Sequence, residues 1–106
     1  RTLFVSGQIA WDAAQQIVSD DFATQFSQAL ENVCAVVTAA GGFPEHIGSL
    51  TIFVTDKAAY LGDLKGVGGA YRRIMGRHYP AMALVEVAAL LEPQAQVEIQ
   101  GIAAIP

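Results

Sequence analysis

The chain has 106 residues, of which 53% are hydrophobic and 15% charged, and this length suits one folded domain. A net charge of −4 with only six Lys and Arg residues argues against a nucleic-acid-binding protein, and no run approaches the ~18 apolar residues of a membrane span. Cys34 is the only cysteine, which excludes an internal disulfide and suits a reducing compartment, so we expect a cytoplasmic protein.

The first half of the chain predicts a strand followed by a long helix. Residues 2–9 indicate a strand, and Gly7 within it marks a bulge or a close backbone approach. Residues 21–40 predict a helix, with Ser19 or Asp20 as its cap. One apolar stripe recurs along it at spacings of three and four: Phe22, Phe26, Leu30, Val33, Val37 and Ala40.

A second strand and a second helix follow. Residues 48–55 alternate as a strand does, and Asp56 is placed to cap a helix over residues 57–76. Four glycines lie in the interior of that helix and weaken it by roughly 1 kcal/mol each relative to alanine. They are Gly62, Gly66, Gly68 and Gly69. Such a run indicates close approach by another backbone or a ligand, or a loose helix.

Two strands complete the predicted sheet, residues 80–91 and 96–102, joined by a short turn at 92–94. The first does not alternate apolar and polar residues, so both of its faces need cover. Glu86 interrupts it, and we expect a structural role for that carboxylate. Two helices cover one face of a four-stranded sheet. A second copy of the chain is the simplest cover for the other, which predicts a homo-oligomer.

Six short motifs, in this order and at this spacing, together resemble the Rid family, also called YjgF/YER057c/UK114, of reactive-intermediate deaminases. The motifs span essentially the whole chain, and each is weak when taken alone. They are Phe4–Ile9, Gln28–Val33, Leu50–Asp56, Tyr79–Ala81, Val85–Val87 and Val97–Ala103.

The resemblance implies an α+β fold, a chorismate-mutase-like (bacillus type) subunit with a mixed sheet and two helices on one face. It also implies a homotrimer, with a central β-barrel and three clefts between subunits. Residues 1–106 then form a single Rid-like domain. Because the chain starts at Arg1 without a methionine, we expect a short N-terminal segment to be missing.

The resemblance also assigns candidate site residues. Ser6 and Gly7 match a Ser-Gly pair that lines the family's cleft. Glu98 matches a glutamate that positions or activates water, so it is the catalytic candidate. Taken without the resemblance, Glu98 fits equally well on a wet strand face between two glutamines, Gln96 and Gln100.

The remaining substrate-binding candidates depart from the family. Met82 stands where the family has an arginine that grips the substrate carboxylate, and a thioether offers no such donors. Leu84 stands at a position that is often cysteine, and an asparagine of the family's second helix falls near Gly68. We therefore expect poor binding of the usual small 2-imino acids and a better fit for a flatter, more apolar ligand.

The resemblance implies hydrolysis of an imine or enamine of another small metabolite, between subunits and without a metal or organic cofactor. Met82 leaves an alternative open, a non-catalytic trimer that binds a metabolite or a protein. Ribonuclease activity, attributed to parts of the family, is disfavoured by the acidic balance. We expect a small-molecule ligand and no nucleic-acid or membrane partner.

Overall fold

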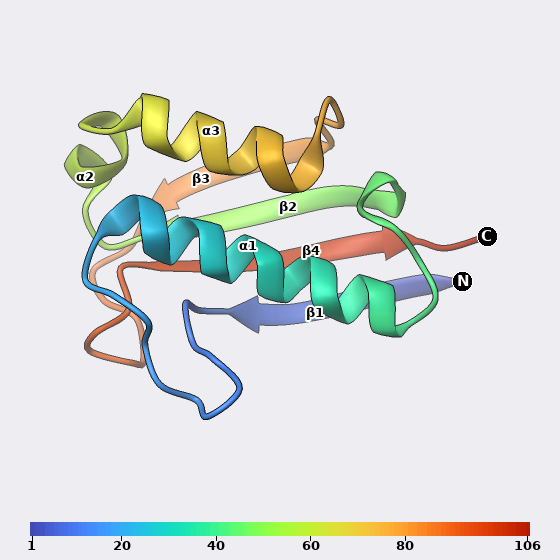
Figure 1. Ribbon diagram of the computed structural model, residues 1–106, viewed down its shortest axis with the longest axis horizontal. Coiled ribbons are helices and arrows are strands. Elements are labelled where there is room, and N and C mark those ends of the chain that lie inside the picture. The colour runs from blue at the N-terminus through green and yellow to red at the C-terminus, as the bar shows by residue number, and fades with distance from the viewer.

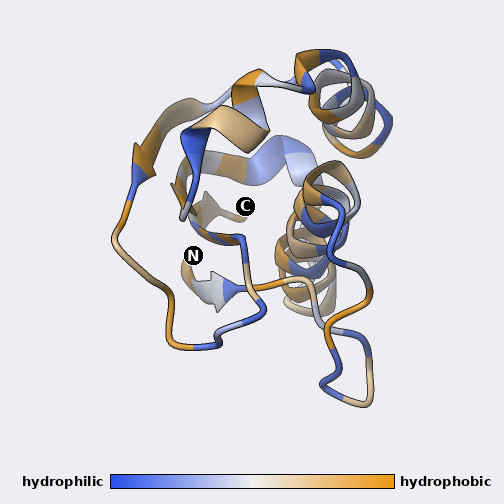
Figure 2. Ribbon diagram, turned by 90° about the vertical axis from the view of Figure 1, so that its left-hand side faces the viewer, coloured by the Kyte–Doolittle hydropathy of each residue, from blue (hydrophilic) through white to orange (hydrophobic).

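A computed structural model describes all 106 residues. Four strands form one mixed sheet in the order β1-β4-β2-β3, in which only the β2–β3 pair is parallel. Figures 1 and 2 show the two long helices, α1 and α3, together on one side of this sheet. The elements are β1 (Thr2–Gln8), α1 (Phe22–Ala39), the 3₁₀ turn η1 (Pro44–His46), β2 (Ile47–Val54), α2 (Lys57–Leu61), α3 (Leu64–Met75), β3 (Ala81–Glu86) and β4 (Val97–Ala104). The expected mixed sheet with two main helices on one face is confirmed.

The core lies between the sheet and the helices. Alternation along β2 and β4 points one set of apolar side chains at α1, whose predicted stripe meets them. The largest fully buried apolar side chains in this layer are Leu30, Val33, Val37, Ile47, Leu50, Val54, Val97 and Ile99. No helix has the length and hydrophobicity needed to cross a membrane.

The predicted helix over 57–76 is in fact two helices, α2 and α3, because the chain is capped twice. Asp56 accepts a hydrogen bond from the backbone N–H of Ala58 at 2.9 Å, as expected for the cap of α2. Asp63 then accepts from the N–H of Gly66 at 3.0 Å and starts α3. The cap predicted for α1 was also misplaced, since Asp21 makes it instead of its neighbours.

The predicted hairpin of the two C-terminal strands is wrong, because β2 lies between β3 and β4. β3 runs parallel to β2 and ends at Glu86, so the chain passes the end of β2 before it returns as the antiparallel β4 on the other side. Residues 87–96 make this connection without regular structure, and Leu91 there is 100% exposed. Glu86 accepts a hydrogen bond from the N–H of Lys57 at 2.9 Å, which confirms its structural role at the start of α2.

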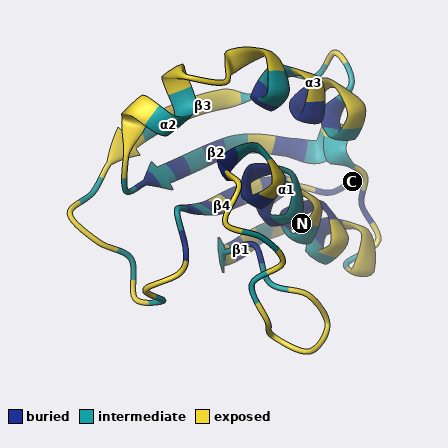
Figure 3. Cartoon of the chain, turned by 60° about the vertical axis from the view of Figure 1, so that its left-hand side comes forward, coloured by how far each residue is buried: buried dark blue, intermediate teal, exposed yellow.

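The opposite face of the sheet carries no covering layer in the subunit. Phe4 is 75% exposed there, and Ile102, its partner across the β1–β4 pair, is also exposed. At the far edge, β3 is exposed along most of its length, as Figure 3 shows. The face is therefore open, as expected from the sequence, but it is less apolar than expected, because Ser49, Thr51 and Gln100 share it with Phe4 and Ile102.

Candidate functional site

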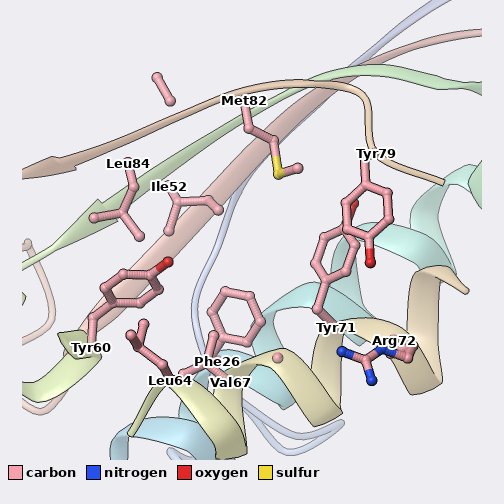
Figure 4. Close-up of a pocket in the computed structure, with 12 residues that line it drawn as sticks. Phe26, Ile52, Tyr60, Leu64, Val67, Tyr71, Arg72, Tyr79, Met82 and Leu84 are labelled. Carbon is pink, nitrogen blue, oxygen red and sulfur yellow. The ribbon is translucent and has the colours of Figure 1, made fainter. Parts of the chain in front are cut away.

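A groove of about 400 Å³ opens between β3 and the helices α2 and α3 (Figure 4). Its lining comes from β2 and β3 on one side and from the helices on the other. Met82 and Leu84 line it from β3, on the same side of the sheet as Ile52 of β2. Most of the lining is hydrophobic, and Gly68 of α3 also borders it. A methyl group built on Gly68 meets no atom within 4 Å, so this part of the groove is open space.

Tyrosines form much of the groove wall. Tyr71 donates its hydroxyl hydrogen bond to the backbone carbonyl of His78 at 2.6 Å, and Tyr79 stacks on its ring with centroids 5.2 Å apart. Burial, followed by the nearby Tyr79, raises the pKa of Tyr71 to about 12, so its hydroxyl stays protonated at neutral pH. Tyr60 lines the groove from α2. These rings offer flat apolar surfaces with polar tips.

A second hollow holds the catalytic candidate. Gly7 and Glu98 line it together with Trp11 and the exposed Leu91. The Glu98 carboxylate lies directly over Gly7, and a Cβ atom at position 7 would overlap it. The pairing of β1 with β4 slips at this point, between Val5 and Gln8. The predicted bulge or close approach at Gly7 is confirmed, and its physical reason is the carboxylate above it.

Two amide side chains fix the loops around the second hollow, and sequence reasoning did not single them out. Asn32 donates hydrogen bonds to the carbonyls of Ile9 and Trp11 at 3.0 and 2.9 Å. Gln25, which is fully buried, donates hydrogen bonds to the carbonyls of Ser19 and Gln94, one on each of the two connections beside the hollow. The sequence could have pointed to both amides, because they lie beside apolar stripe residues of α1 and not on its solvent-facing side.

One subunit does not bring all the predicted site residues together. Met82 and Leu84 share the groove, and Gly7 and Glu98 share the second hollow. Ser6 lies in a third, smaller depression on the open face of the sheet. The groove and the hollow have no lining residue in common.

Comparison with known proteins gives the family. The family described as endoribonuclease L-PSP matches residues 1–105. Protein DfrA of Myxococcus xanthus is 40% identical over 101 residues, covering 94% of this chain and 73% of that protein. A 2-iminobutanoate/2-iminopropanoate deaminase of Salmonella typhimurium is 38% identical over 104 residues, covering 95% and 77%.

Solved structures agree with the sequence relatives. The crystal structure of E. coli TdcF with bound serine superimposes with a TM-score of 0.83 at 33% identity, over 99% of this chain and 81% of that one. The mixed four-stranded sheet and the two main helices thus match known Rid/YjgF structures. The chain belongs to the endoribonuclease L-PSP family, which is the Rid/YjgF family that its motifs resemble.

Proposed function

We propose that this protein is a Rid-type homotrimer that hydrolyses an imine or enamine of a small metabolite in clefts between subunits. The observation that carries the proposal is Glu98, a carboxylate held over Gly7 in a hollow of a chain related to imine deaminases. Residues 1–106 act in it as one domain. The proposal places the protein in the cytoplasm, since its single thiol, Cys34, suits a reducing compartment.

We place the active site between subunits because the Met82 groove and the Glu98 hollow are separate within one subunit. A ligand in the groove of Met82 cannot reach Glu98 of the same subunit through a shared cavity. In a cleft between subunits, the groove of one copy faces the Glu98 hollow of another, so a ligand contacts both the groove and the carboxylate. The exposed apolar side chains on the open face, with Phe4 75% exposed, give the subunits a reason to associate.

The chemistry needs only proton transfer and water. Water adds to the C=N carbon, and the carbinolamine then expels ammonia and leaves a carbonyl. The Glu98 carboxylate is suited to take the proton from the attacking water and to return it to the leaving nitrogen. Its side chain makes no hydrogen bond within the subunit, and the backbone of Gly7 lies directly beneath the carboxylate in the same hollow. Both carboxylate oxygens of Glu98 are therefore available to water and substrate.

The substrate differs from the usual small 2-imino acids. With Met82 in place of the arginine, the strand offers no paired donors for a carboxylate. Losing such a charged contact costs on the order of 2–5 kcal/mol. A larger, unsaturated or carbonyl-bearing metabolite gains contacts with the apolar wall instead.

The test is ammonia release from freshly generated imines, both aliphatic and muconate-type. We expect the Glu98→Gln variant to lose at least about 100-fold in rate, the usual range for removing a general acid–base group. The exposed Glu45 on η1 is the matched control, and Glu45→Gln should keep the wild-type rate. If wild type and Glu98→Gln release ammonia at the same rate on every substrate, the deaminase proposal is wrong.

A non-catalytic binding trimer is the second candidate, because Met82 and the apolar lining leave the strand without a substrate anchor. The Met82→Arg variant distinguishes the deaminase from the non-catalytic binding protein. Gain of 2-imino acid hydrolysis indicates working machinery with a redirected specificity, whereas no gain together with inert wild type favours the binding protein.

The homotrimer has its own test. Native mass spectrometry should show three copies of the 11.2 kDa chain, and Phe4→Glu on the open face should shift the distribution toward single subunits. Thr2→Glu, at an exposed position of the same strand outside this apolar pair, is the control. A folded single subunit as the main wild-type species at micromolar concentration would exclude the shared cleft.

A further inference from the structure

Arg72 is the one charged residue in the lining of the Met82 groove, and the subunit gives its guanidinium no partner. Two other arginines of the chain have partners, and Arg77, which has none, lies outside the groove. Arg73, the next residue, pairs with Glu31 at 3.3 Å and bonds to the Ser27 hydroxyl, and Arg1 donates to the Ala40 carbonyl at 3.0 Å. No Asp or Glu lines the groove. The groove is thus apolar with one unpaired positive end.

The position of Arg72 is set by a well-held part of the chain. Tyr71, directly before it, is buried and tied to the His78 carbonyl at 2.6 Å. Tyr79 stacks on Tyr71, and Figure 4 shows Arg72 beside these two rings, at one end of the groove. Figure 4 also shows Tyr60, Leu84 and Met82 along the rest of the wall. The cation and the apolar wall therefore face one space.

We propose that this groove binds a flat, largely apolar carboxylate, an aryl or conjugated acid, with its carboxylate on Arg72. The inference rests on the proposed function and names its substrate class, a conjugated or aryl-bearing imine that carries a carboxylate. A planar guanidinium matches a carboxylate through two parallel hydrogen bonds. The anion is then held from helix α3 at Arg72, and not from strand β3 at Met82. The groove volume of about 400 Å³ fits a metabolite of this size.

Binding of two isosteric probes tests the charge requirement. We would titrate the protein with 2-naphthoate and with its neutral analogue 2-naphthamide by isothermal calorimetry. We expect naphthoate to bind about fivefold more tightly, the size of an exposed charge pair. Propanoate, which has the carboxylate without the ring, should bind at least about tenfold more weakly than naphthoate, because it buries far less apolar surface.

Substitutions identify the cation. Arg72→Gln should abolish the preference for naphthoate over naphthamide, while naphthamide affinity stays the same. Arg77→Gln, which removes an exposed arginine outside the groove, should keep the preference. Raising NaCl from 20 to 500 mM should shrink the preference in wild type without any substitution. Equal affinity for the two probes in wild type, a preference that survives Arg72→Gln, or no binding of either probe would each overturn the inference.

The outcome is separable from that of the deaminase assay, because equilibrium binding requires no turnover. Naphthoate binding through Arg72 without ammonia release from any imine would reject only the catalytic role of Glu98. Imine hydrolysis without a charge-dependent preference for naphthoate would reject only the substrate class.

Discussion

Replacing Gln25 by leucine tests whether one buried amide holds the region around Glu98. The Gln25 side chain is fully buried in α1. Its amide nitrogen donates to the carbonyls of Ser19 and Gln94 at 2.8 and 3.0 Å, and its oxygen accepts from the N–H of Gln96 at 2.9 Å. Leucine is close to it in size, so it removes three hydrogen bonds with little change in packing. The two connections that flank the hollow then lose these ties to α1, and the first of them keeps the bonds from Asn32.

The expected loss of folding stability in Gln25→Leu follows from the three backbone groups that are left without a hydrogen-bond partner. Each costs about 1–3 kcal/mol when it stays away from water. Ser19 and Gln94 lie near the surface, so water relieves part of this, and we expect a total of about 3 kcal/mol. For a domain of this size that amounts to a fall in Tm of at least about 10 °C.

Urea unfolding followed by far-UV circular dichroism measures the effect, at one fixed protein concentration because assembly adds to stability. Gln16→Leu is the control, since Gln16 is exposed and its side chain makes no hydrogen bond. A loss below 1 kcal/mol for Gln25→Leu, or an equal loss for the control, would show that the three bonds do not hold these loops.

Three further predictions concern local chemistry. Gly69→Ala should raise stability by up to about 1 kcal/mol, since its Cβ meets open space, whereas Gly66→Ala, whose Cβ overlaps the capping carboxylate, should lower Tm. Burial raises the pKa of Cys34 to about 11, so native protein should react with a disulfide reagent at pH 8 far more slowly than urea-unfolded protein, and stability from this thiol should be lost as pH rises from 9 through 11. Hydrogen bonds from Thr24 lower the pKa of Asp21, so this cap stabilises the fold above pH 3.8 and the stabilisation is lost as pH falls through the lowered pKa. Asp21→Asn should remove that part of the acid dependence when Tm is measured as a function of pH.

The sequence predicted helices and strands well where the spacing of apolar residues determines the element. It predicted them poorly where the pairing of strands determines their order in the sheet. The stripe of α1 follows from helical spacing alone. The split of residues 57–76 was missed because Asp56 and Asp63 lie seven residues apart, about two helical turns, so the apolar stripe continues through the break. The order of β3 and β4 was missed because neighbours along the chain need not be neighbours in a sheet, and β2 pairs with both.

The same division applies to the site. Gly7 was predictable as a place of close approach, since glycine inside a strand signals it. Its partner, Glu98, comes from β4, which pairs with β1 from the other end of the chain, and only the fold supplies that contact. The groove lies between β3 and the helices, and the Glu98 hollow lies between β1, β4 and the loops beside them, an arrangement that no local pattern encodes.

Two of the departures from the family, the lost arginine and the lost asparagine, meet in one place, and this argues for a changed ligand. The resemblance sets an arginine at Met82 and an asparagine near Gly68, and the structure shows that both positions line the same groove. A single loss would leave the other polar group unpaired against an apolar wall, which is costly. With both replaced, Arg72 is the charged group that remains.

The double variant Gly68→Asn/Met82→Arg should therefore bind a small 2-oxo acid such as pyruvate more tightly than Met82→Arg alone, because the amide gives the new guanidinium and the carboxylate a shared partner. Gly68 has room for the side chain, since its Cβ meets nothing within 4 Å. Gly69→Asn on the same helix, outside the groove, is the control. Calorimetric affinities for pyruvate compare the variants. If the double variant binds no better than Met82→Arg, the two positions do not act together, and the groove gives no reason to treat their replacement as one event.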